Sequence, residues 1–201
     1  MSEDAVTKGK REGRGTMAWG ITGSGHRLAE TVEALKTQQR RHRNRVDIAV
    51  YLSKAGYQVM KYYKLMDTLT DAFGRIRIEQ DSNTPFLAGA LQLGKFDLFL
   101  IAPATSNTVA KIALGIADSL LTNSVIMALK AFVPVYIMPS DYAVGVTVTK
   151  LPDGRDLRLR IRREDVAHVK KLARMDGVFV LEDLEELDQV FYTRFHDEED
   201  A

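Results

Sequence analysis

The chain has 201 residues, of which 45% are hydrophobic, so it can fill one sizeable core and its length does not require a second domain. The 28 lysines and arginines nearly balance the 27 aspartates and glutamates, which gives no reason to expect nucleic acid or a membrane as the main partner. The absence of cysteine excludes disulfides and cysteine-bound iron–sulfur clusters, and with four scattered histidines no metal site is expected. No apolar run reaches the roughly 18 to 20 residues of a membrane span, and no secretory signal is visible, so the cytoplasm is the expected compartment.

Residues 1–15 are polar and charged, which predicts a flexible leader before a single domain over residues 16–195 and an acidic tail over 196–201. In the domain, short apolar strands alternate with amphipathic segments, which favours parallel pairing and helices on both faces. This order predicts a three-layer, Rossmann-like α/β fold with an open parallel sheet. The expected strands are Ala18–Ile21, Val46–Leu52, Ile76–Ile78, Phe96–Ala102, Val133–Met138 and Val178–Leu181. The expected helices are about Arg27–Gln39, Ala55–Met66, Phe86–Leu93, Asn107–Gly115, Ser119–Lys130 and Glu164–Arg174, with one more from Leu184.

An appended β-hairpin is expected at about residues 144–162, because apolar residues alternate on both sides of the turn sequence Pro152-Asp153-Gly154. Arg158, Arg160 and Arg162 take the outward positions of this pattern. Such a face is solvated, in contact with protein, or able to bind an anion, and solvation is the favoured interpretation.

A glycine-rich turn, Gly20 to Gly25, lies between the first strand and the first helix, where free amides and the helix dipole favour an anion. Gly23 and Gly25 allow close approach of the backbone, and the Thr22 and Ser24 hydroxyls can bind phosphate oxygens. Tight turns also contain glycine for steric reasons, so this feature alone is ambiguous. It matches neither the dinucleotide fingerprint nor the P-loop pattern.

Further polar residues follow the other strands, where ligands bind in open α/β sheets. The second strand ends in Ser53-Lys54, in place of the acidic residue of classical dinucleotide folds, and the central strand runs into Pro103 to Thr108. Ser82 to Pro85 and Asp118 to Asn123 add two more polar segments. Helix capping explains single residues of this kind, so the sequence leaves open whether each residue caps a helix or contacts a ligand.

In combination, these motifs resemble the homo-oligomeric flavin-containing decarboxylase superfamily, whose members bind FMN between subunits. The chain is most similar to the archaeoflavoprotein and dihydromethanopterin reductase (acceptor) group, from about Ala18 to Leu187. The segments that carry the resemblance are Thr22 to Gly25, Ser53-Lys54, Asn83 to Phe86, Pro103 to Thr108, Gly115 to Asn123, Leu151 to Arg155 and Arg163 to Val166.

The resemblance implies an FMN-dependent oxidoreductase that reduces a dihydropterin by hydride transfer, as a homo-oligomer of trimers or larger assemblies built from trimers. Residues implied to hold the phosphate and ribityl groups are Thr22, Gly23, Ser24, Gly25 and Ser53. Residues implied to line the same cofactor are Ala104, Thr105, Asn107 and Thr108, and further candidates are Lys54, Asp118, Ser119, Leu120 and Thr122.

The decarboxylase members share a P-A-M-N motif after the last core strand, where this chain has Met138-Pro139-Ser140-Asp141, so decarboxylation is the less favoured activity. An electron-transfer flavoprotein that accepts electrons from ferredoxin is the main alternative. The basic run Arg40 to Arg45 is a solvated loop or a docking site for such an acidic donor.

No catalytic residue can be chosen from the sequence. His26, Asp141 and Tyr142 lie near the expected site as candidate proton donors, although water would also serve. Trp19 and Phe86 adjoin the candidate loops and are the aromatic residues that we would expect to stack on a flavin or pterin, although a place in the core is more common for such residues.

Overall fold

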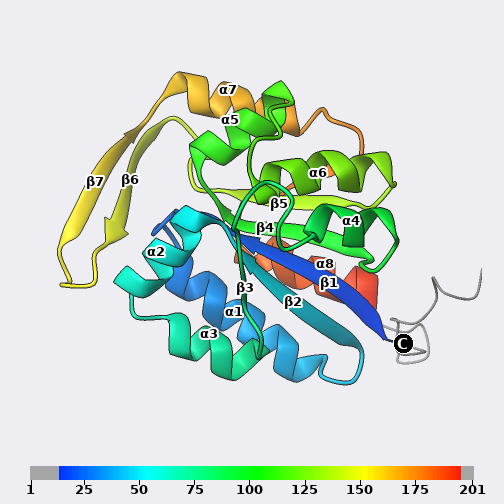
Figure 1. The fold of residues 1–201 in the computed structure, drawn as a ribbon. Coiled ribbons are helices and arrows are strands. Elements are labelled where there is room, and N and C mark those ends of the chain that lie inside the picture. Colours follow the sequence, from blue (N-terminus) through cyan, green and yellow to red (C-terminus); the bar gives the residue numbers. More distant parts are fainter. Residues whose placement is uncertain (1–13, 196–201) are drawn as a thin grey trace, which may run out of the picture.

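The computed structural model describes residues 14–195, so the predicted acidic tail and almost all of the predicted leader lie outside the described residues. Six parallel strands form one open sheet in the order β3-β2-β1-β4-β5-β8 (Figure 1). This architecture confirms the predicted fold class. The strands are β1 (Gly15–Ile21), β2 (Val46–Leu52), β3 (Arg77–Ile78), β4 (Leu98–Ala104), β5 (Val135–Pro139) and β8 (Val178–Val180).

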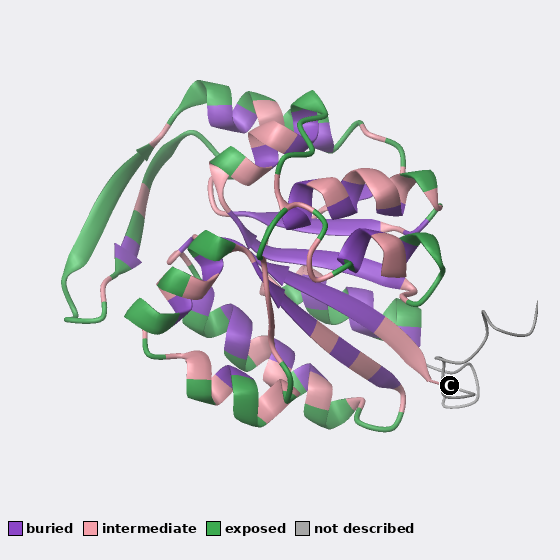
Figure 2. Ribbon diagram, in the orientation of Figure 1, coloured by how far each residue is buried: buried purple, intermediate pink, exposed green. Residues whose placement is uncertain are grey.

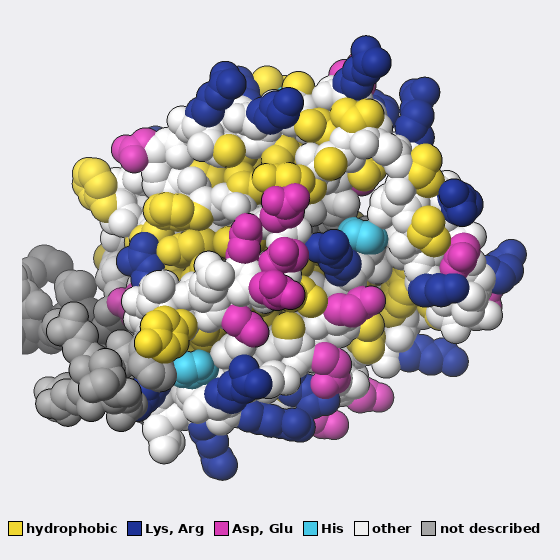
Figure 3. Space-filling view, turned by 180° about the vertical axis from the view of Figure 1, so that it is seen from behind, with side chains coloured by type: hydrophobic (Ala, Val, Ile, Leu, Met, Phe, Trp, Pro, Cys, Tyr) yellow, Lys and Arg dark blue, Asp and Glu magenta, His cyan; other side chains and the backbone are white. Residues whose placement is uncertain are grey.

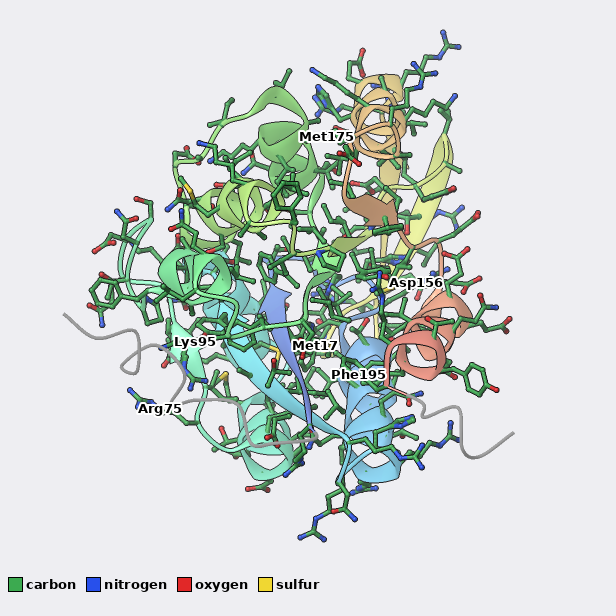
Figure 4. The ribbon with its side chains drawn as sticks, turned by 90° about the vertical axis from the view of Figure 1, so that its right-hand side faces the viewer. Met17, Arg75, Lys95, Asp156, Met175 and Phe195 are labelled. Atoms are coloured by element: carbon green, nitrogen blue, oxygen red, sulfur yellow. The ribbon has the colours of Figure 1, made fainter. Side chains whose placement is uncertain are left out.

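Helices cover both faces of the sheet, and each face has its own hydrophobic cluster. One layer comprises α1 (Leu28–Arg41), α2 (Lys54–Tyr62), α3 (Met66–Phe73) and α8 (Leu184–Phe195). The other comprises α4 (Leu87–Gln92), α5 (Ser106–Leu114), α6 (Leu120–Lys130) and α7 (Arg163–Leu172). Every residue of β4 is buried, as expected for a strand covered on both sides (Figure 2). Figure 4 shows the layers from another side, with Met17 in the interior and Phe195 on α8, both members of one cluster.

β1 begins earlier than predicted, since Gly15, assigned to the leader, is its first residue. The Gly15 amide donates to Arg45 O at 2.8 Å, and the Thr16 amide donates to Asp97 Oδ2 at 2.7 Å. A Cβ atom at Gly15 would lie 2.4 Å from the ring of Phe195. The start of the strand is therefore fixed by tertiary contacts that local composition does not reveal.

The predicted helix over residues 55–66 is shorter than expected, since α2 ends at Tyr62, and the helix that follows, α3, was not predicted. The break occurs at Lys64, which has a positive φ of 56° and turns the chain between the helices. This turn allows Leu69 of α3 to be fully buried in the core. The burial of an apolar residue in the core therefore overrides the local helical pattern.

The predicted hairpin is present as β6 (Gly145–Lys150) and β7 (Asp156–Ile161), which form a separate antiparallel pair projecting from the body (Figure 1). Its register differs from the expected separation of apolar and arginine faces. Val146 is opposite Arg160 and Val148 is opposite Arg158, so valines and arginines share one face of the hairpin.

All six strands are parallel, so the loops that follow them leave the same edge of the sheet, here called the carboxyl edge. The strand order reverses between β1 and β4, which are neighbours in the sheet. Ligands of open α/β sheets bind outside such a reversal, so this geometry locates the place to search for a site. No helix within residues 14–195 is long and apolar enough to cross a membrane.

Candidate functional site

Thr22 joins the loops that follow β1 and β4 at the carboxyl edge. Its hydroxyl donates to Pro103 O at 2.7 Å and accepts from the Thr105 amide at 2.9 Å, and the side chain is 2% exposed. The hydroxyl therefore has partners within the protein. This differs from the expectation that it binds a phosphate oxygen, since a buried hydroxyl with both roles filled has little to offer a ligand.

Two serines extend this connection to the loop after β5. Ser140 Oγ lies 2.6 Å from Ser24 Oγ and 3.1 Å from Ala104 O, and the Ser140 amide donates to the same carbonyl at 2.8 Å. Ser24 Oγ also accepts from the His26 amide at 3.2 Å. The three loops at the centre of the carboxyl edge are thus held together by hydroxyl groups.

The glycine turn keeps free backbone donors. Among the described residues, the amides of Gly23, Ser24 and Gly25 donate to no protein group, and no side chain caps the start of α1. We call these three amides the amide cradle. The glycines themselves are explained by packing against α2, because a Cβ at Gly23 would lie 2.7 Å from Ala55 Cβ and one at Gly25 would lie 2.5 Å from Tyr63 Oη. Packing leaves the free donors unexplained, and they suit an anion.

Several predicted site residues are helix caps, the alternative that the sequence left open. Ser53 Oγ accepts an amide hydrogen bond from the first turn of α2 at 2.9 Å. Thr105 caps α5 by accepting from the Thr108 amide, and the two hydroxyl oxygens lie 3.0 Å apart. Ser119 and Thr122 form a capping box at the start of α6. Capping therefore accounts for these side chains without a ligand.

Glu79, immediately after β3, was not identified from the sequence. Its Oε2 accepts from the Lys54 amide at 2.8 Å, and its Oε1 accepts from the Leu120 amide at 2.7 Å. One carboxylate therefore bridges the amino ends of α2 and α6, where a negative charge is favoured by both helix dipoles. Because Glu79 fills these positions, the amide cradle is the better place for a phosphate.

Two candidate side chains remain available to a ligand. Asn107 is exposed and makes no hydrogen bond within residues 14–195, and Lys54 is exposed and forms no ion pair in the same part of the chain. Asp118 differs from them because it pairs with Lys111 at 2.8 Å. The side chain of Leu120 is fully buried.

A second polar group lies where the hairpin joins the body. Ser106 Oγ donates to Asp141 Oδ2, and Thr147 Oγ1 lies 3.2 Å from His26 Nδ1. Burial of His26, reinforced by the neighbouring Arg27, lowers the pKa of its imidazole, while Asp141 opposes this shift. The structure therefore brings all three candidate proton donors to the carboxyl edge, since Tyr142 lies in the loop after β5 and interacts with Glu182 in the loop after β8. His26 favours its neutral form there.

The two aromatic candidates differ in position. Trp19 is fully buried, donates from its indole nitrogen to Ala102 O at 2.7 Å, and packs edge-on against Phe73. The expectation that Trp19 stacks on a ligand is wrong, because the residue is part of the core. Phe86 is 74% exposed at the start of α4 and remains available.

No group of three histidine, cysteine, aspartate or glutamate side chains in residues 14–195 is arranged to hold a metal ion. The groups that the protein leaves available for a ligand are the three amides of the cradle, the side chains of Asn107 and Lys54, and the ring of Phe86. Such groups suit a phosphorylated organic molecule.

Comparison with known proteins places these features in a family. The family model described as Flavoprotein matches residues 6–150. An uncharacterised protein of Methanocaldococcus jannaschii is 50% identical over 174 residues, which are 87% of this chain and 92% of that protein. A dihydromethanopterin reductase (acceptor) of the same organism is 38% identical over 142 residues, which are 68% of this chain but 57% of the reductase.

A solved structure of the Burkholderia xenovorans protein DmrB in complex with FMN, described as a cubic protein cage for redox transfer, is similar to the whole domain. The two chains are 30% identical with a TM-score of 0.76, and the match covers 92% of this chain and 97% of DmrB. The family match covers more than half of the chain and agrees with the resemblance recognised in the sequence motifs. The chain therefore belongs to the Flavoprotein family.

Proposed function

We propose that this chain binds FMN at the carboxyl edge and places the FMN phosphate on the amide cradle of Gly23, Ser24 and Gly25. The observation that carries this proposal is the set of three free amides beside the uncapped start of α1, at the reversal of strand order. A phosphate there gains several hydrogen bonds and the favourable end of the helix dipole. The family relationship and the FMN in DmrB support the choice of flavin over another phosphorylated ligand.

The other candidate residues would act along the same edge. Asn107, with its free side-chain amide, would hydrogen-bond the cofactor, and the exposed ammonium of Lys54 would face its polar part. The caps Ser53 and Thr105 would act indirectly, by fixing the helix starts from which these side chains project. Thr22 would hold the loops of β1 and β4 at a constant separation.

We propose that the activity is that of a cytoplasmic oxidoreductase that reduces a dihydropterin, by analogy with the dihydromethanopterin reductase that it resembles. When bound and reduced, FMN supplies the hydride chemistry, and the protein supplies binding, orientation and polarity. Ser106 and Asp141 lie at the carboxyl edge and would form the polar wall on the hairpin side. A homo-oligomer built from trimers agrees with the cage described for DmrB.

An electron-transfer role, with ferredoxin as donor and no turnover of a pterin, is the second candidate. The match covers 57% of the reductase with which this chain aligns, so the activity of that whole enzyme is a proposal for this chain. A decarboxylase is less favoured, because the chain has Met138-Pro139-Ser140-Asp141 where decarboxylases have the P-A-M-N motif. Two of these residues make hydrogen bonds within the protein, Ser140 with Ser24 and Asp141 with Ser106.

The test is an absorption spectrum of the purified protein, release and identification of the chromophore, and then reduction followed by addition of dihydromethanopterin. Bound FMN that is reoxidised by the pterin supports the reductase. Bound FMN that is reduced by reduced ferredoxin but is not reoxidised by the pterin supports electron transfer. Protein that neither contains nor binds a flavin refutes the cofactor proposal, and carbon dioxide release from a carboxylated thiol would favour the decarboxylase.

A further inference from the structure

The hairpin β6–β7, here called the arm, exposes a mixed face of valines and arginines. Val146 and Val148 are 57% and 41% exposed, and their cross-strand partners are Arg160 and Arg158. An isolated two-stranded hairpin is at best marginally stable in water, so an arm of this kind gains from being covered. A partner for this face must supply both apolar surface and negative charge.

The charges on this face are only partly neutralised within the arm. Arg158 and Arg160 form no ion pair among the described residues, whereas the cations nearer the turn and the base are paired. The neutralised pairs are Lys150 with Asp156, Arg155 with Asp153 and Arg162 with Asp165. The two free arginines therefore mark the middle of the arm as the cationic part.

A surface of the opposite character lies at the start of α8. Glu182, Asp183, Glu185 and Glu186, here called the acidic strip, lie together there. Acidic side chains also gather on the rear face of the molecule (Figure 3). Their carboxylates form no ion pair with any cation in residues 14–195, although two of them accept amide hydrogen bonds in the strip itself. Phe179, three residues before the strip, is 44% exposed and adds apolar surface.

We propose that the arm of one copy of this chain docks on the acidic strip of a second copy. Arg158 and Arg160 would pair with the glutamates of the strip, and Val146 and Val148 would pack beside Phe179. The strip concentrates like charges whose mutual repulsion a partner's cations relieve, and the arm carries the matching cations and apolar groups. The two surfaces differ, so the contact is heterologous and joins copies into a ring or a closed assembly.

The test uses two complementary variants and measures molecular mass by light scattering. The first variant carries Arg158→Glu and Arg160→Glu, and the second carries Glu182→Lys and Glu185→Lys. Each variant alone is expected to have a lower mass than the wild-type protein. A third variant that combines all four substitutions is expected to regain the wild-type mass, because every reversed arm then meets a reversed strip in a ring of any size. Increasing salt should reduce the mass of the wild-type assembly.

The control is the variant Arg75→Glu, Lys95→Glu. It changes the net charge by the same amount as the first variant, but on the side of the molecule away from the arm and α8 (Figure 4). It should keep the wild-type mass, and circular dichroism should show all four variants folded. A folded first variant with wild-type mass overturns the proposal. So does a folded variant with all four substitutions that fails to reassemble, or a wild-type protein that is a monomer. Flavin content is measured separately, so a failure here does not depend on the FMN proposal.

Discussion

Replacing Thr22 with valine tests whether the loops of β1 and β4 are joined by this hydroxyl. Valine has nearly the same shape, but it leaves Pro103 O without its donor and the Thr105 amide without its acceptor. Each unsatisfied buried partner costs about 1–3 kcal/mol. The Thr22 amide also lies 3.3 Å from Pro103 O and can partly satisfy that carbonyl, so we expect the free energy of unfolding to fall by about 2–4 kcal/mol.

The measurement is urea unfolding of the protein without flavin. At about 2–4 °C per kcal/mol for a domain of this size, the melting temperature should also fall by about 5–15 °C. Thr22→Ser keeps the hydroxyl and should lose clearly less stability. Thr70→Val is the matched control, since the Thr70 hydroxyl donates a hydrogen bond to Met66 O at an exposed position of a helix. This substitution should cost little stability, because water can replace the lost bond. A loss below about 1 kcal/mol, combined with weaker FMN binding, would mean that Thr22 serves the ligand and not the loops.

Three further predictions concern the same edge. Glu79→Gln removes a charge that bridges two helix ends and should lower stability by about 1–3 kcal/mol in urea unfolding, whereas Glu164→Gln, at an exposed position, should have little effect. The lowered pKa of His26 means that the unfolded chain binds a proton at higher pH than the folded chain. Stability should therefore fall as the pH drops below about 6.5, and thermal melts of His26→Gln should show a smaller fall. Asn107→Asp should change the stability of the flavin-free protein by no more than about 0.5 kcal/mol, because its side chain has no partner in the described structure, but should weaken FMN binding measured by fluorescence titration. Unchanged FMN affinity would remove Asn107 from the proposed site.

The fold could be predicted because its signals are local and repeated. A continuous apolar strand such as β4, in which every residue is buried, can only be accommodated in a sheet covered on both faces. The break between α2 and α3 could not be predicted, since it depends on the left-handed turn at Lys64 and on burial of Leu69. The hairpin was recognisable from its turn, but its register depends on pairing across the strands.

The candidate site was harder to predict because the same residue types serve two purposes. Serine and threonine after a strand are good helix caps, and they are also good phosphate ligands. Ser53, Thr105 and Ser119 use their side-chain oxygens as caps, which only the geometry could reveal. Glu79 could not be predicted from the sequence, because a single acidic residue after a short strand does not form a recognisable motif.

The distinction that matters is therefore between polar groups that the fold uses and those that it leaves free. At the carboxyl edge the helix starts of α2, α5 and α6 are capped by side chains, while the start of α1 is not. A fold that satisfies three neighbouring helix starts and leaves the amides of Gly23, Ser24 and Gly25 unpaired keeps donors for one anionic group at the fourth. The glycines of the turn were weak evidence for this site, because packing alone requires them. A side chain at Gly23 would collide with Ala55, and one at Gly25 would collide with Tyr63. The unpaired donors are the stronger signal, and they identify the place where a phosphate would complete the hydrogen bonding of the protein.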